Sequence, residues 1–84
     1  MKKKFLLREI DGEFLLVPLG SGQKQFTSMI TMNETGAFIW KCLEKNMSPD
    51  TIAEKLSQEY LVTVDKAKED TLKLIDYLRT KHIL

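Results

Sequence analysis

The chain of 84 residues is poor in the residue types that build disulfides and metal sites, with one cysteine and one histidine. A single cysteine excludes an internal disulfide, and Cys42 with His82 cannot supply a usual zinc ligand set. Long apolar runs are lacking too: the run at residues 5–7 ends at Arg8, which is too short for a signal peptide. We therefore predict a cytoplasmic protein without a structural metal or another cofactor, a location that also suits a free cysteine.

An excess of charge of one sign is also absent. Thirteen Lys and Arg against twelve Asp and Glu give a net charge of +1. Such a domain has no global field that attracts nucleic acid, so we expect no nucleic-acid partner. The 43% hydrophobic and 30% charged composition is that of a globular protein, and it argues against disorder and against a membrane-bound chain. The length allows one core, so residues 1–84 are predicted to form a single domain.

Strand signals occupy the first third of the chain. Two short apolar runs, at residues 5–7 and 14–17, flank Asp11 and Gly12, a pair typical of a tight hairpin turn. A third strand is predicted within residues 25–32, which are rich in β-branched and large side chains and contain neither Gly nor Pro.

Helical periodicity begins after Asn33, which is a good N-cap, and starts again after Ser48, where Pro49 suits the first helical position. Asp65 is the predicted cap of the third helix. The expected helices cover residues 34–45, 49–60 and 66–81, with an extended stretch at 61–64. Strands followed by helices indicate an α+β domain with three antiparallel N-terminal β-strands and three α-helices.

The helical spacing also predicts a core. Each helix has one apolar face, and the C-terminal apolar pair is expected to fold back onto it. These residues are Ala37, Phe38, Trp40 and Leu43 in the first helix, Ile52, Ala53, Leu56 and Tyr60 in the second, Ala67, Thr71, Leu74, Ile75 and Leu78 in the third, and Ile83 with Leu84.

No catalytic arrangement is legible in the sequence. Cys42 lies on a helix beside Leu43 and is better interpreted as a small buried hydrophobe than as a nucleophile. His82 stands beyond the last helix, where a cation interacts well with the helix dipole. Residues 20–22, Gly-Ser-Gly, lack the Gly-Lys-Ser/Thr continuation of a phosphate loop. We expect a protein that is not an enzyme and has no catalytic or metal-binding residues.

The third strand offers a different kind of site. It is the last strand of the sheet, and an unpaired edge accepts a peptide strand through main-chain hydrogen bonds. On the third helix, Leu72 points about 60° away from Ile75 at about 100° per residue. If that helix follows the strand edge, Leu72, Ile75 and Arg79 would form the wall of a groove.

Two other functions stay open at this point. Three helices can also form a winged-helix DNA-binding regulator with the third helix in the groove of DNA, although that helix has as many acidic as basic residues before Arg79. An interaction module that pairs with an enzyme subunit or with itself, as a weak homodimer, is the other alternative.

The segment from Met32 to Trp40, with its Asn-Glu-Thr-Gly helix start, resembles the PqqD family, coenzyme PQQ synthesis protein D. The likeness continues through nearly the whole chain in the family's order. Its further parts are the opening residues 8–13, the helix residues 52–56, Tyr60, Asp70, and the ending Ile83-Leu84.

The resemblance implies a winged helix-turn-helix-like fold and a non-catalytic peptide chaperone. Such a recognition element binds the leader segment of a ribosomally made precursor peptide and brings it to a modifying enzyme, commonly a radical S-adenosylmethionine (SAM) protein. It implies that the leader adds to strand three beside helix three, at Thr27, Ser28, Met29, Ile30, Thr31, Leu72, Ile75 and Arg79. Asn33, Thr35, Gly36 and Trp40 are interpreted as capping and core residues, with Gly36 permitting close packing of helix and sheet.

Overall fold

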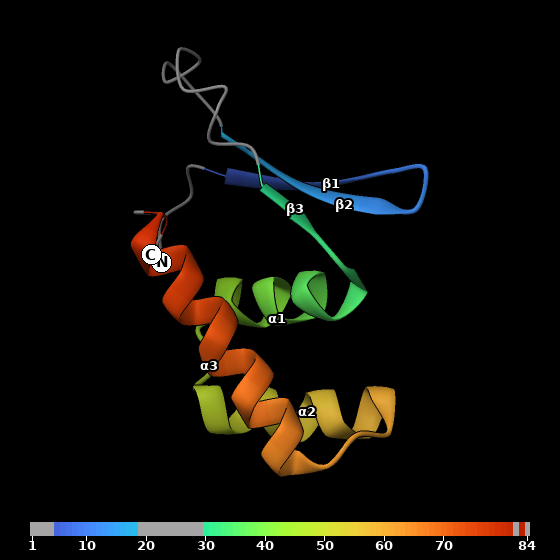
Figure 1. The fold of residues 1–84 in the computed structure, drawn as a ribbon, viewed down its shortest axis with the longest axis vertical. Helices are drawn as coiled ribbons and strands as arrows, with labels where there is room; N and C mark the ends of the chain where they lie inside the picture. Colours follow the sequence, from blue (N-terminus) through green and yellow to red (C-terminus); the bar gives the residue numbers. More distant parts are fainter. Residues whose placement is uncertain (1–4, 19–29, 82, 84) are drawn as a thin grey trace.

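The computed structural model describes residues 5–18, 30–81 and 83 (Figure 1). Three strands precede three helices, which confirms the predicted α+β order. The elements are β1 (Phe5–Ile10), β2 (Glu13–Pro18), β3 (Ile30–Met32), α1 (Glu34–Glu44), α2 (Pro49–Tyr60) and α3 (Val64–Thr80).

The sheet is antiparallel with the order β1-β2-β3. Its first two strands meet in the predicted tight turn, where Asp11 and Gly12 have φ values of 54° and 82°. Positive φ at both central residues matches the twist of the flanking strands. Leu16 of the central strand stands opposite Leu7 on one side and Ile30 on the other. Directly opposite residues share a face, so these three side chains lie in one row.

The third strand covers the last three residues of the stretch predicted for it. Ile30 pairs with Leu16, and Met32 pairs with Phe14. The earlier part of the prediction, residues 25–29, lies outside the described residues.

The first two helices begin where the sequence predicts. The Oδ1 atom of Asn33 accepts a hydrogen bond from the Gly36 N–H at 2.8 Å. The Oγ atom of Ser48 accepts one from the Thr51 N–H at 3.2 Å. Each cap satisfies one of the backbone donors that the first turn of a helix leaves free.

The predicted start of the third helix was wrong. Thr63, with extended backbone at φ −66° and ψ 154°, is the N-cap, and its Oγ1 accepts from the Lys66 N–H at 3.1 Å. Asp65 lies in the first turn, where its charge suits the helix dipole. The extended stretch predicted at 61–64 is accordingly wrong at both ends: Leu61 is the left-handed C-cap of α2, and Val64 is the first residue of α3.

The helices lie on one side of the sheet, and α3 crosses in front of α1 and α2 (Figure 1). One buried cluster joins the sheet to α1 and the end of α3: Leu16, Ile30, Met32, Trp40, Leu78 and Ile83. A second joins the three helices: Ile39, Cys42, Ile52, Ala53, Leu56 and Ala67. Leu43 and Leu74 pack against both clusters, so the two are continuous.

The predicted helix faces are confirmed by these clusters, and Cys42 is buried as expected. Ile39 belongs to the core although the sequence analysis did not place it there. Ile83 folds back and is 2% exposed, while His82 and Leu84 lie outside the described residues. In the described part of the chain, none of the helices has the length and apolar character needed to cross a membrane.

Candidate functional site

The outer edge of β3 is open. Its one neighbour is β2, and no strand in the described ranges lies beyond it. The opposite edge, on β1, is open in the same sense, but β3 is the edge strand that leads directly into the helices: Met32 precedes the cap of α1, and Ile30 shares a cluster with Leu78 of α3. An open edge presents unpaired N–H and C=O groups that can accept another strand.

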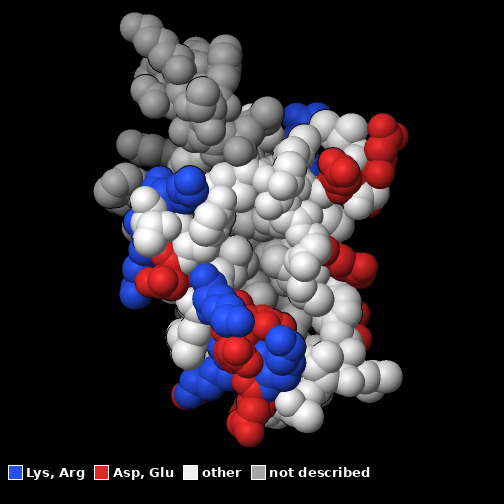
Figure 2. All heavy atoms as spheres, in the orientation of Figure 1, with Lys and Arg blue, Asp and Glu red and all other residues white. Residues whose placement is uncertain are grey.

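A groove of about 320 Å³ lies between the start of α1, which directly follows β3, and the middle of α3. Figure 2 shows a hollow below the sheet on this face, with charged side chains of both signs gathered over α3 beside it. The α1 side of the groove is lined by Asn33, Thr35, Gly36 and Ile39, and the α3 side by Asp70, Lys73 and Leu74.

Close packing at Gly36 shapes the α1 wall. A Cβ atom at this position would stand 3.2 Å from Asn33 Oδ1 and 3.4 Å from Met32 Cβ. The absence of a side chain therefore lets α1 start directly under the end of β3, as expected for Gly36. The Thr35 hydroxyl donates to the same Asn33 oxygen at 3.0 Å, which fixes the helix start further.

The α3 wall is charged but locally balanced. Asp70 pairs with Lys66 at 3.4 Å, and Lys73 pairs with Glu69 at 3.3 Å, each one helical turn away. These exposed pairs contribute little to stability, but they leave the wall without net charge. Because Leu74 is half-buried beneath them, the groove suits uncharged or apolar side chains better than strongly charged ones.

The residues predicted for the strand side of the site fall into two groups. Thr27, Ser28 and Met29 lie outside the described residues. Ile30 is 7% exposed and belongs to the core, whereas Thr31 is exposed on the strand that forms the open edge.

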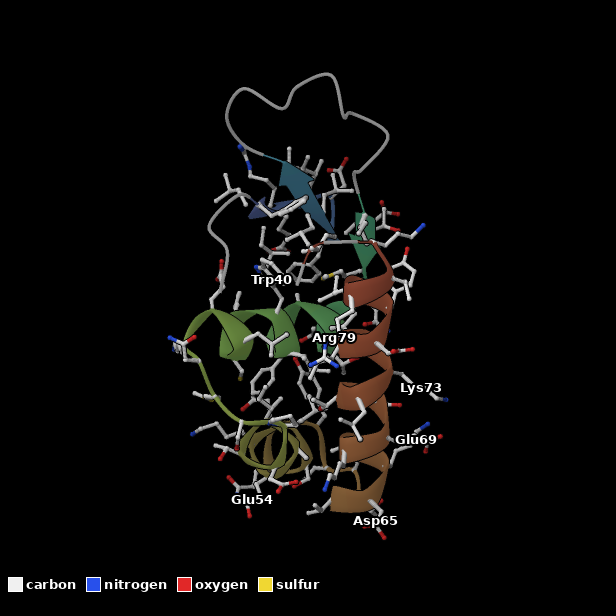
Figure 3. The ribbon with its side chains drawn as sticks, turned by 90° about the vertical axis from the view of Figure 1, so that its left-hand side faces the viewer. Trp40, Glu54, Asp65, Glu69, Lys73 and Arg79 are labelled. Atoms are coloured by element: carbon white, nitrogen blue, oxygen red, sulfur yellow. The ribbon has the colours of Figure 1, made fainter. Side chains whose placement is uncertain are left out.

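On α3 the structure separates the predicted residues from the groove. Ile75 is 7% exposed, while Leu72 is 46% exposed and Arg79 is exposed. Figure 3 shows Arg79 on the side of α3 opposite Lys73. At about 100° per residue, Leu72 lies on the flank that carries Arg79. A role for Leu72, Ile75 or Arg79 in binding stays a prediction, and none of them lines the groove.

The groove residues of α3, Asp70, Lys73 and Leu74, were missed by the sequence analysis. The periodicity shows that α3 is amphipathic and that Leu74 belongs to its inner face. It does not show which of the two flanks beside that face follows β3, because this depends on how the helix crosses the sheet. Asp70 is half-buried while the other charged residues of α3 are exposed, and this difference is visible only in the structure.

Potential catalytic groups are poorly placed for chemistry. Burial raises the pKa of the Cys42 thiol above its ordinary value of 9.0, and the charges of Lys45 and Lys55 offset this only in part. A thiol with a raised pKa carries little of the reactive thiolate near neutral pH. Within residues 5–18, 30–81 and 83, no group of three or more His, Cys, Asp or Glu side chains could hold a metal ion.

Comparison with known proteins gives one family and two solved structures. The family described as Coenzyme PQQ synthesis protein D (PqqD) matches residues 13–84. The structure of TbiB1 in complex with the TbiA(beta) leader peptide is similar at a TM-score of 0.76 and 24% identity, over 99% of this chain and 91% of that one. A lasso peptide synthetase B1 complexed with the leader peptide has a TM-score of 0.72 and 25% identity, over 94% of this chain and 87% of that one. No curated protein matches the chain significantly.

Proposed function

Because this chain belongs to the PqqD family of coenzyme PQQ synthesis protein D, we propose that it is a peptide chaperone for a ribosomally made precursor peptide. The leader segment of that peptide adds as a fourth strand to the outer edge of β3. Both similar structures are complexes with leader peptides, which supports this choice of ligand.

The open edge of β3 beside the α1–α3 groove is the observation that carries the proposal. An added strand gains main-chain hydrogen bonds from the edge, and alternate side chains of the strand point to one face. Those side chains would enter the groove over Ile39 and Leu74. The edge thus supplies affinity for any extended peptide, while the groove selects among peptides.

The bound leader is then delivered to a modifying enzyme, which we propose to be a radical SAM protein, in the cytoplasm. The chain itself performs no reaction in this proposal. The raised pKa of Cys42, the one free thiol, supports that role. Ordering a flexible leader costs conformational entropy, so we expect a modest affinity that allows the peptide to be passed on.

A peptide modified on its backbone tests strand addition without changing the protein. The probe is the leader segment of a precursor peptide encoded beside this chain, prepared as a set in which one amide at a time is N-methylated. Strand addition predicts that methylation weakens binding at every second position, because alternate amides of an added strand face the partner strand. Isothermal titration across the set measures this, and uniform tolerance of methylation would contradict the proposal.

Two arginine variants test where the peptide lies. Thr35→Arg places a long charged side chain at the groove, and Leu72→Arg places the same side chain on the opposite flank of α3. We expect Thr35→Arg to weaken leader binding roughly tenfold or more, and Leu72→Arg to leave it unchanged. The reverse result would move the site to the flank that carries Leu72 and Arg79. Amide NMR spectra of both variants verify that each is folded.

The winged-helix DNA-binding alternative gains no support from the charges of α3. Lys66, Lys68 and Lys73 each pair with a carboxylate, at 3.4, 2.7 and 3.3 Å. A DNA-reading helix needs basic side chains available to phosphates, so peptide recognition is the function we put forward.

A further inference from the structure

A second hollow, of about 400 Å³, lies between α1 and α2. Its apolar part is formed by Phe38, Cys42 and Met47, and Phe38 is held by an edge-to-face contact with Tyr60 at 5.7 Å between ring centroids. Its basic part is formed by Lys41, Lys45 and Lys55.

The three lysines of this hollow are not neutralised by neighbours. None of them lies within 4.0 Å of a carboxylate in the described part of the chain, whereas the lysines at positions 66, 68 and 73 do. Glu59 is the one acidic residue of the lining. Lys45 and Lys55 lower the pKa of Cys42 against the stronger effect of burial, so their positive charge acts inside the hollow. In a chain with a net charge of +1, this is a local concentration of positive charge.

The hollow and the peptide groove occupy different sides of α1. At about 100° per residue, Phe38 and Lys45 point nearly opposite to Gly36, the centre of the groove wall. The groove uses α3 for its other wall, but the hollow uses α2 and no residue of α3. A leader strand beside β3 would therefore leave the hollow free for a second partner.

We propose that this hollow, defined by Phe38, Lys41, Cys42, Lys45, Met47 and Lys55, docks an acidic segment with one or two large apolar side chains, supplied by the enzyme that modifies the bound peptide. The inference rests on the proposed function, because it presupposes such an enzyme. The apolar floor receives the apolar anchor, and the three lysines attract the flanking carboxylates. The peptide and the enzyme then bind to opposite sides of α1 at the same time.

A defined probe tests the chemistry of the hollow. The probe is a blocked peptide with two adjacent leucines between three glutamates on each side, and the control peptide has lysines in place of the glutamates. Titrated into the isotope-labelled protein, the acidic peptide should shift the amide signals of Phe38, Cys42 and Met47. Added salt should weaken the effect, since it screens exposed charges. No shift there, an equal effect of the basic peptide, or shifts confined to Thr31, Thr35 and Leu74 would overturn the proposal.

Matched variants separate the hollow from overall charge. Lys41→Gln with Lys55→Gln removes two charges from the hollow, and Lys68→Gln with Lys81→Gln removes two that lie outside it. Both pairs lower the net charge from +1 to −1. We expect the first pair to weaken binding of the acidic peptide roughly fivefold or more, and the second to leave it nearly unchanged, because exposed ion pairs act locally. Equal losses of affinity in the two variant pairs would show that net charge alone explains the binding. That result would overturn the docking site.

The same variants distinguish this proposal from the peptide-binding function. The Lys41→Gln, Lys55→Gln protein should bind the leader segment normally but lose binding to the modifying enzyme encoded with it. If this variant binds the enzyme normally, the proposal that the enzyme docks in the hollow is overturned. If the unchanged protein does not bind the leader segment, that result would instead contradict the proposed function, whatever the hollow binds.

Discussion

Leu61 has a backbone conformation that costs stability and a side chain that contributes little to the fold. Its backbone is left-handed, at φ 56° and ψ 41°, and its side chain is 90% exposed. A left-handed conformation costs an L-residue about 1–2 kcal/mol, whereas glycine adopts it freely. We therefore expect Leu61→Gly to raise the free energy of unfolding by about 1 kcal/mol, after the greater flexibility of glycine in the unfolded chain is deducted. In a domain of this size, that corresponds to a rise in Tm of about 4–8 °C in a thermal melt.

Leu61→Ala is the matched control for this prediction. It removes the exposed apolar side chain but keeps the Cβ atom that makes the left-handed backbone unfavourable. Its Tm should stay close to that of the unchanged protein. A glycine variant no more stable than the alanine variant would show that the backbone conformation is not the source of the cost.

Cys42 provides a pH-dependent prediction. Burial raises the pKa of its thiol above 9.0, and Lys45 and Lys55 oppose the rise. As pH increases past about 9, the unfolded state loses this proton first, so the contribution of Cys42 to stability is present below that pH and is lost above it. We also expect iodoacetamide at pH 8.5 to modify Cys42 more slowly in the folded protein than in denaturant. Lys45→Gln with Lys55→Gln should slow the folded-state reaction further, and a faster reaction would contradict the assigned cause.

The start of α3 shows how far local sequence signals go at the scale of an element. The starts of α1 and α2 are predictable because each cap is followed directly by a residue that suits the first turn: Glu34 follows Asn33, and Pro49 follows Ser48. Before α3, both Thr63 and Asp65 are good capping residues, and the prediction of Asp65 was wrong. The choice depends on which residue takes the extended conformation, and the left-handed turn at Leu61 brings Thr63 into that position.

Two alanine variants measure this difference directly. Thr63→Ala removes the oxygen that accepts from the Lys66 N–H, so we expect the free energy of unfolding to fall by about 1 kcal/mol. Asp65→Ala removes only a favourable charge in the first turn and should cost less. Urea denaturation followed by circular dichroism gives both values. A larger loss of stability in Asp65→Ala than in Thr63→Ala would contradict Thr63 as the N-cap and favour Asp65.

The candidate site was less predictable than the elements that form it. The open edge of β3 could be predicted, because the order of apolar runs and turns along the chain sets the order of the strands. The groove requires the position of α3 against α1, and a helix with an apolar face can be approached from either flank. Asp70 and Leu74 lie on one flank, and Leu72 lies on the other. Leu72 was predicted because it points about 60° away from Ile75 and because the family resemblance implies it. An isolated surface leucine of this kind is common in proteins.

At the scale of the whole molecule, the two buried clusters have to be considered together. The sheet cluster contains Trp40, and the helical cluster contains Ile52. Leu43 and Leu74 contact both, so no solvated layer separates the sheet from the helical layer. A small domain with one continuous core is expected to unfold in a single cooperative transition.

Ile52→Val tests this cooperativity at a distance. Ile52 is fully buried in the helical cluster, and the loss of one methylene should cost about 0.5–1.5 kcal/mol. Trp40, the one tryptophan of the chain, is fully buried in the sheet cluster, so its fluorescence reports on that layer while far-ultraviolet circular dichroism reports on the helices. Because the clusters are continuous, we expect the variant to lower the urea midpoints of both signals equally. If the dichroism midpoint fell while the fluorescence midpoint stayed, the sheet with β3 would be a separate unit, and its edge could open or close independently of the helices.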